Sequence, residues 1–97
     1  HIVDLVDAHA RALDHLRAGH AALAANLATG TGSSVRQVIN SVARIGGRPV
    51  PHVIAARRPG DPPILVADPT HAQRVLGWRH RYGLDDMVAH AWTWFAR

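Results

Sequence analysis

Residues 34–47 read SVRQVINSVARIGG, and this stretch carries its own helix start, apolar stripe and helix stop. Ser34 and Gln37 have the spacing of a capping box, in which each side chain bonds the backbone N–H of the other residue. Apolar side chains recur on one helical face, at Val35, Val38, Ile39, Val42 and Ile45. Gly46 and Gly47 then end the pattern. The stretch therefore predicts an amphipathic helix.

The chain before this helix predicts a strand end, a helix and a second strand. His1–Val3 has the pattern of a strand end, and Asp4 can cap the helix that follows, because its carboxylate can accept the free N–H groups of the first turn. Residues on one helical face recur at Leu5, His9, Ala12, Leu13 and Leu16. Gly19 is a suitable helix end, and the apolar run Ala21–Leu27 is typical of a buried strand.

The chain after residue 47 predicts short strands and two more helices. Val50–Ala56 has strand character, and Ile64–Val66 is a shorter extended piece. Asp68 as cap and Pro69 as first helical residue predict a short helix that ends at Gly77. A last amphipathic helix is marked by Leu84, Met87, Val88, Ala91 and Phe95.

Helices and short strands thus alternate, which predicts an α/β layer, or an α+β arrangement in isolation. The chain has 97 residues and no internal repeat or dividing linker, so we expect residues 1–97 to form a single small domain. The apolar stripes are generous for so few strands, and we expect the domain to pack on a larger partner; a compact standalone fold is the alternative. The chain begins at His1 without methionine, which predicts a fragment, a cleaved product or a trimmed form.

The composition argues against several kinds of site and partner. There is no cysteine, so disulfides, thiolate nucleophiles and cysteine-based zinc sites are excluded. The net charge is +4, but the arginines are scattered rather than gathered in one stripe, and no nucleic-acid partner is expected. No apolar run approaches ~18 residues, so no membrane span is expected. A cytoplasmic setting is the default expectation.

Three other patterns are weak signs of chemistry. The eight histidines include no His-Glu-x-x-His signature, so no metal site is predicted, and the absence of a Gly-x-Ser-x-Gly elbow argues against a hydrolase. Gly30–Gly32 precedes a helix whose N-terminus could attract phosphate. However, Val35 stands where the third glycine of a dinucleotide-binding loop would be, and a flexible turn is the favoured interpretation.

Residues 57–61, Arg-Arg-Pro-Gly-Asp, carry the best candidate for ligand binding. Pro59 fixes its own φ and restricts Arg58, while Gly60 permits a tight reversal, so a guanidinium and a carboxylate are presented on one stiff loop. A guanidinium suits phosphate oxygens, and the carboxylate of Asp61 can accept hydrogen bonds from sugar hydroxyls. This pair suits a nucleotide diphosphate with its ribose. A solvated turn closed by an internal Arg–Asp pair would have the same sequence.

Five motifs resemble, in order and spacing, the C-terminal part of UDP-glucose 4-epimerases, which are NAD-dependent extended short-chain dehydrogenases/reductases. They are His1–His9 (HIVDLVDAH), Asn26–Val35 (NLATGTGSSV), Arg57–Asp61 (RRPGD), Ala67–Trp78 (ADPTHAQRVLGW) and Trp92–Trp94 (WTW). Each motif is modest alone, but the ordered set covers essentially the whole chain.

The resemblance implies a substrate-binding role for three residues. Arg58 is similar to the residue that holds the diphosphate of UDP, Asp61 to the one that bonds the ribose, and Val35 to a residue that lines the nucleotide pocket. Two positions depart from the family pattern. Ala28 replaces a glycine, and Leu65 stands where members with a narrow sugar pocket often carry tyrosine.

The reaction that the resemblance implies interconverts UDP-glucose and UDP-galactose through a 4-keto intermediate with bound NAD. It requires a glycine-rich Rossmann loop and a Tyr-x-x-x-Lys pair, whereas Tyr82 is the only tyrosine here and no lysine is present. We therefore expect a UDP-sugar-binding domain without the N-terminal Rossmann half, with no catalytic residue, no bound NAD and no turnover by itself. The alternative is a non-enzymatic module, derived from a truncated epimerase, that self-associates as a homo-oligomer or binds nucleotides.

Overall fold

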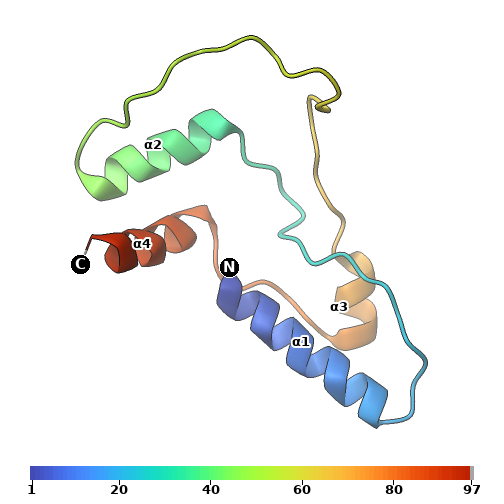
Figure 1. The fold of residues 1–97 in the computed structure, drawn as a ribbon. Coiled ribbons are helices and arrows are strands. Elements are labelled where there is room, and N and C mark those ends of the chain that lie inside the picture. The colour runs from blue at the N-terminus through green and yellow to red at the C-terminus, as the bar shows by residue number, and fades with distance from the viewer. Residues whose placement is uncertain (97) are drawn as a thin grey trace. The chain divides into compact units, whose positions relative to one another are not determined.

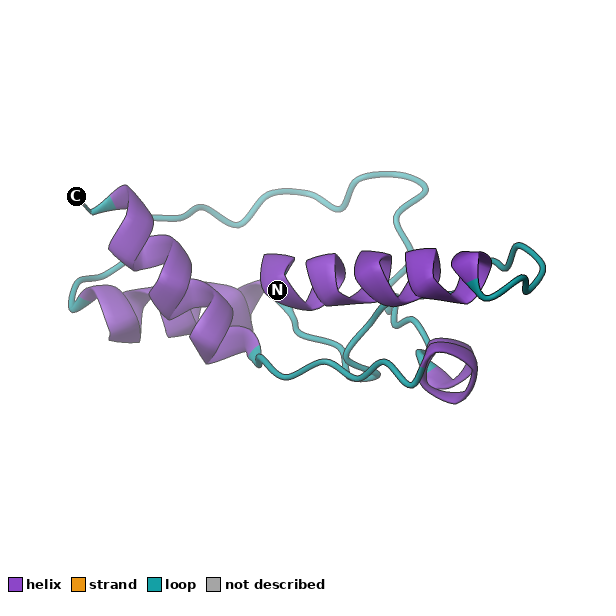
Figure 2. Ribbon diagram, turned by 90° about the horizontal axis from the view of Figure 1, so that it is seen from below, coloured by secondary structure: helices purple, strands orange, loops and turns teal. Residues whose placement is uncertain are grey.

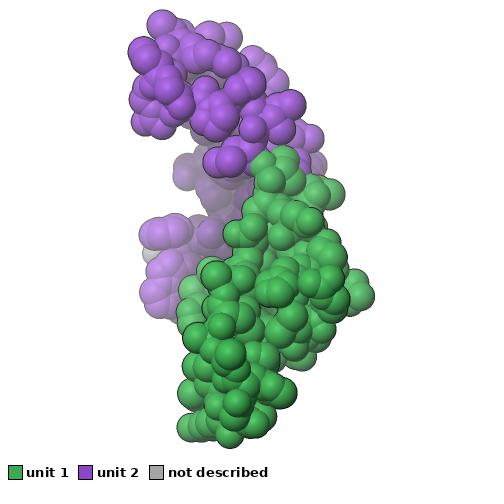
Figure 3. All heavy atoms as spheres, turned by 90° about the vertical axis from the view of Figure 1, so that its right-hand side faces the viewer, with its two compact units in different colours: residues 1–31, 66–83 green, residues 32–65, 84–97 purple. Residues whose placement is uncertain are grey.

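The computed structural model describes residues 1–96, in which helices are joined by extended segments (Figures 1 and 2). The helices are α1 (Ile2–Arg17), α2 (Val35–Gly46), α3 (Thr70–Leu76) and α4 (Leu84–Phe95). The chain divides into two compact units, coloured separately in Figure 3. The first unit contains residues 1–31 and 66–83, and the second contains residues 32–65 and the chain from Leu84 onward. No helix of residues 1–96 is both long enough and apolar enough to span a bilayer.

The start and end of α2 confirm the prediction from residues 34–47. The Ser34 Oγ accepts a hydrogen bond from the Gln37 backbone N–H at 3.2 Å, and the Gln37 Oε1 accepts one from the Ser34 N–H at 2.7 Å. The helix ends at Gly46, and Gly47 adopts the left-handed conformation with φ 66°. The predicted last helix is also confirmed, as α4.

The beginning of α1 differs from its prediction in two respects. His1–Val3 is not a strand end, because the helix begins at Ile2, and Asp4 is not the cap. The His1 ring caps the helix instead, since its Nδ1 accepts a hydrogen bond from the Val3 N–H at 3.0 Å. The predicted end is confirmed: α1 stops at Arg17, and Gly19 follows with φ 86°.

The third helix starts one residue later than the sequence predicts. Pro69 is the N-cap rather than the first helical residue, and α3 begins at Thr70. The Asp68 Oδ1 still accepts a hydrogen bond from the Thr70 N–H at 2.9 Å. The Thr70 hydroxyl and then this N–H stabilise the charged form, and they hold the pKa of Asp68 below its usual value. Gly77 ends the helix in the left-handed conformation, as expected.

No strand forms among residues 1–96, so the predicted short strands at Ala21–Leu27, Val50–Ala56 and Ile64–Val66 are not present. These segments run as irregular extended chain, drawn in teal in Figure 2. A helix satisfies its backbone groups within one segment, whereas a strand needs the N–H and C=O groups of a neighbour. The fold of residues 1–96 is consequently helical, with extended chain in place of the predicted strands.

The core of the first unit is small and centred on a tryptophan. Trp78 is only 2% exposed and packs with Ala8 of α1 and Ala72 of α3. Partly buried Ala25, Leu27 and Leu76 complete the cluster. The extended segment after α1 therefore contributes to the core although it forms no strand.

A buried carboxylate joins α1 to the chain after α3. Asp4 is 2% exposed, and its carboxylate accepts hydrogen bonds from the backbone N–H groups of Arg81 and Tyr82, each at 3.2 Å. The Trp78 Nε1 donates to the Asp4 carbonyl at 2.8 Å. Burial raises the pKa of Asp4, but the two N–H groups, the positive charge of the N-terminus and the Arg81 guanidinium together outweigh it, so that the pKa lies below its usual value.

The second unit is built from α2 packed against α4. Ser41 of α2 is 3% exposed, and its hydroxyl donates to Asp85 Oδ1 at 2.6 Å. Arg44 donates to the same oxygen at 2.6 Å. Arg44 first and Ser41 second hold the pKa of Asp85 below its usual value. One polar cluster therefore links the two helices.

Candidate functional site

The loop that carries the predicted binding residues is a closed turn. The Asp61 backbone N–H lies 3.4 Å from the Arg58 carbonyl oxygen, which it bonds across the turn. Gly60 has φ 88°, a left-handed conformation that residues with a Cβ rarely adopt. Pro59 precedes it and restricts the conformations open to Arg58. The sequence Arg-Pro-Gly-Asp therefore holds its first and last residues close together.

Arg58 and Asp61 form an ion pair on the outside of this turn. The Arg58 Nε donates to Asp61 Oδ2 at 3.0 Å. The two side chains are 82% and 49% exposed, so both charged groups remain accessible from solvent. Exposed pairs of this kind contribute at most about 1 kcal/mol, and a ligand with suitable charges can share or displace them. The arrangement can bind a group that combines negative oxygens with hydroxyls.

The third predicted residue, Val35, lies on the first turn of α2. Its side chain is 76% exposed, which leaves an apolar surface beside the start of the helix. The structure pairs Arg58 with Asp61 but shows no hydrogen bond or ion pair that would tie Val35 to them. Its assignment to a nucleotide pocket stays a prediction.

The glycine-rich segment before α2 is a short turn within the described residues. The Thr29 hydroxyl donates to the Thr31 carbonyl at 2.9 Å, and Gly30 between them has φ 77°. Val35 replaces the third glycine that a dinucleotide-binding loop requires, and the Ser34–Gln37 capping box already uses two amides at the start of α2. These residues do not fit an NAD site, and the turn accounts for Gly30.

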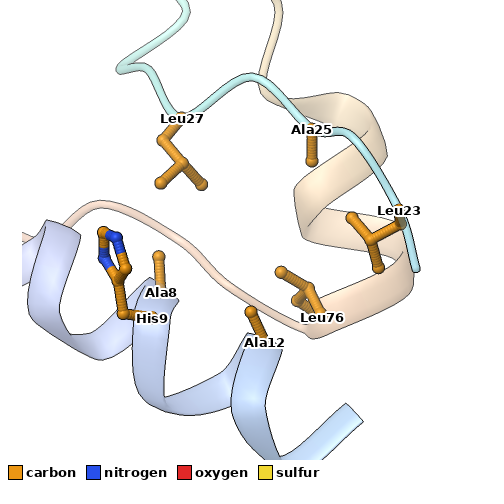
Figure 4. A pocket seen from close by; sticks show the side chains of 7 residues that line it. All are labelled: Ala8, His9, Ala12, Leu23, Ala25, Leu27 and Leu76. Carbon is orange, nitrogen blue, oxygen red and sulfur yellow. The ribbon is translucent and has the colours of Figure 1, made fainter. Parts of the chain in front are cut away.

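Two hollows elsewhere in the described chain are apolar. One open pocket of about 150 Å³ in the first unit lies between α1, the extended segment after it and α3, as the labelled side chains in Figure 4 show. A groove of about 470 Å³ in the second unit is lined by Val38, Val42, Leu84, Met87, Val88, Ala91, Trp92 and Phe95. The groove is formed by apolar residues of the two helical stripes that the sequence predicts, but it was not among the predicted ligand-binding sites. Neither lining contains the cationic donors that a diphosphate needs.

Residues 1–96 contain no cluster of metal-ligating side chains. No group of three or more His, Asp or Glu side chains lies close enough there to hold an ion. The Arg58–Asp61 pair stays the predicted ligand-binding site of the second unit.

Comparison with known proteins gives this pair its context. No family model matches the chain. The UDP-glucose 4-epimerase of Rhizobium meliloti (strain 1021) is 41% identical over 97 residues, which is 100% of this chain and 30% of that protein. That of Bacillus subtilis (strain 168) is 43% identical over 94 residues, or 97% of this chain and 28% of that protein. This chain matches UDP-glucose 4-epimerases along its whole length.

Solved epimerase structures share the fold as well. UDP-glucose 4-epimerase from Bifidobacterium longum, in complex with NAD+ and UDP, superposes with a TM-score of 0.86 at 36% identity and covers 99% of this chain. The epimerase from Brucella ovis, in complex with NAD, gives a TM-score of 0.88 at 43% identity over 94% of this chain. The chain spans 28% and 29% of these two proteins. These matches are consistent with a C-terminal portion of an epimerase.

Proposed function

We propose that this chain is the UDP-sugar-binding C-terminal part of a UDP-glucose 4-epimerase, a cytoplasmic isomerase that interconverts UDP-glucose and UDP-galactose. Residues 1–97 would act together as its substrate-binding domain. The observation that carries the proposal is the exposed Arg58–Asp61 pair on a closed Pro-Gly turn. The similarity in fold to an epimerase solved with NAD+ and UDP supports it.

In this proposal, each of the three residues binds the part of UDP that suits its chemistry. Arg58 holds the diphosphate, because a guanidinium presents several N–H groups to negative oxygens. Asp61 accepts a hydrogen bond from a ribose hydroxyl. Val35 offers an apolar contact to the nucleotide beside the start of α2. The positive and negative groups of the turn thereby match neighbouring parts of one ligand.

The hydride chemistry belongs to the part of the epimerase that this chain does not span. Its partners would be a UDP-sugar and the NAD-binding Rossmann half, and NAD supplies the redox step when bound there. We do not expect the 97 residues to turn over substrate by themselves, because they contain no lysine for a Tyr-x-x-x-Lys pair.

Titration of UDP into the 97-residue chain by calorimetry tests the proposal. We expect measurable binding that Arg58→Ala weakens by about tenfold to a hundredfold, since a hydrogen bond to a charged group contributes about 1.5–3 kcal/mol. Arg57→Ala is the matched control, because it removes the same charge from the preceding position of the same loop.

Circular dichroism is the check that each variant keeps its helices. The proposal fails if the folded chain does not bind UDP. It also fails in its assignment of the phosphate site if Arg57→Ala and Arg58→Ala weaken binding equally, because a diffuse positive potential would then explain the affinity.

The apolar groove of the second unit supports the second candidate function, a self-associating module. A contiguous apolar lining of this size favours contact with another protein surface. Sedimentation velocity separates the two candidates. A stable homo-oligomer without UDP affinity favours the module, whereas UDP binding that depends on Arg58 favours the epimerase part in any state of association.

A further inference from the structure

We infer that Asp61 is also a positioning residue, which holds the Arg58 guanidinium with its outer edge directed to phosphate. The inference rests on the proposed function and adds a second role to the carboxylate. Ribose binding alone would require Asp61 to face the ligand and would leave Arg58 to be ordered by the phosphate itself.

The bonding of the pair leaves both groups able to bind UDP without separating. Asp61 uses Oδ2 to accept from the Arg58 Nε at 3.0 Å. Within residues 1–96, neither the Nη1 and Nη2 atoms of Arg58 nor the Asp61 Oδ1 takes part in any other hydrogen bond or ion pair. The two Nη groups can therefore donate to phosphate oxygens while Oδ1 accepts from a ribose hydroxyl.

The turn makes this pairing local and repeatable. The hydrogen bond from the Asp61 backbone N–H to the Arg58 carbonyl closes the turn, and Gly60, with φ 88°, permits the chain to reverse there. An exposed arginine otherwise populates many rotamers, and a ligand that binds it must restrict them. A carboxylate that has already selected the rotamer removes part of this entropic cost.

Charge alone predicts the opposite effect, which makes the inference testable. A carboxylate beside a phosphate site repels the ligand, so removal of Asp61 would strengthen phosphate binding if its charge were all that mattered. Asp61→Asn and Asp61→Ala remove the same charge. Only the asparagine keeps a side-chain oxygen that can accept the bond from the Arg58 Nε.

The test is calorimetric titration of inorganic pyrophosphate, which lacks ribose, into the full 97-residue chain and its variants. We expect Asp61→Ala to bind pyrophosphate about twofold to tenfold more weakly than Asp61→Asn, the range for the loss of one hydrogen bond. Arg58→Ala should lose pyrophosphate binding. Circular dichroism verifies that the two Asp61 variants have the same helix content.

The outcomes separate this inference from the proposed function. Equal or tighter pyrophosphate binding by Asp61→Ala than by Asp61→Asn would overturn the positioning role alone, provided that UDP binding still depends on Arg58. UDP binding without any pyrophosphate binding would also overturn it alone, because a positioned guanidinium should bind the isolated phosphates. A chain that binds neither compound would overturn both.

Discussion

At Gly46, the last residue of α2, one added methyl group should destabilise the second unit. A Cβ there would lie 2.7 Å from Cη2 of Trp92, closer than such atoms normally approach. Alanine usually favours a helix over glycine by about 0.5–1 kcal/mol. Overpacking costs about 1–3 kcal/mol and should dominate. We expect Gly46→Ala to lower the free energy of unfolding by about 1–2 kcal/mol, measured by urea denaturation.

The same substitution in a Trp92→Leu chain supplies the control. The smaller side chain makes room for the methyl group, so the added cost of Gly46→Ala should vanish there. An equal cost in both backgrounds would show that the helix end, rather than contact with Trp92, requires glycine at this position.

At the same scale, the sequence identifies Arg58 and Asp61 as a charged pair on a stiff turn, because proline and glycine restrict the backbone locally. The bond between them also follows from local spacing. The role of Asp4, in contrast, does not follow from the local sequence. Its partners Arg81 and Tyr82 lie 77 and 78 residues away, and an aspartate near a helix start has the same local pattern whether it caps or is buried.

The capping box of α2 should make a measurable contribution at the scale of the element. Ser34→Ala removes the oxygen that accepts the Gln37 N–H at 3.2 Å. We expect a loss of about 0.5–2 kcal/mol in the free energy of unfolding, with Ser33→Ala, at the exposed neighbouring position, as the control. Urea denaturation followed by circular dichroism measures both. Equal stability of the two variants would mean that packing on α4 alone sets where α2 begins.

The elements that could be predicted are those whose signals are local. The serine cap and the glycine stops at Gly19, Gly47 and Gly77 act through neighbouring backbone, and the structure places helix ends at each of them. The strand predictions failed at Ala21–Leu27 and Val50–Ala56 because apolar composition indicates burial without supplying a pairing partner.

Acid should unfold the molecule through its bonded carboxylates, of which Asp4 is the buried one. Its pKa is lowered in the folded state, so its contribution is complete above its unfolded value of about 3.9 and is lost as the pH falls through the folded value. The lowered pKa values of Asp68 and Asp85 act in the same direction. We expect the urea midpoint to fall between about pH 5 and pH 2.

The variant Asp4→Asn measures how much of this loss of stability in acid comes from the buried Asp4 carboxylate. This variant should be less stable than the parent by about 1–3 kcal/mol at pH 7, and the difference should shrink below about pH 4. Asp14→Asn, on the exposed face of α1, is the control for the loss of one negative charge. A constant difference between Asp4→Asn and the parent at every pH would assign the effect to packing instead of charge.

The bond from Asp4 to Tyr82 also has a consequence for the order of events during synthesis. Asp4 leaves the ribosome before its partners, because the N–H groups that complete its site are made 77 and 78 residues later. At about 5–20 residues per second, roughly 4–15 seconds pass between the synthesis of Asp4 and that of its donors, and during this time the carboxylate is hydrated. The first unit can close only when translation has passed Tyr82, by which time α2 has long been available to form.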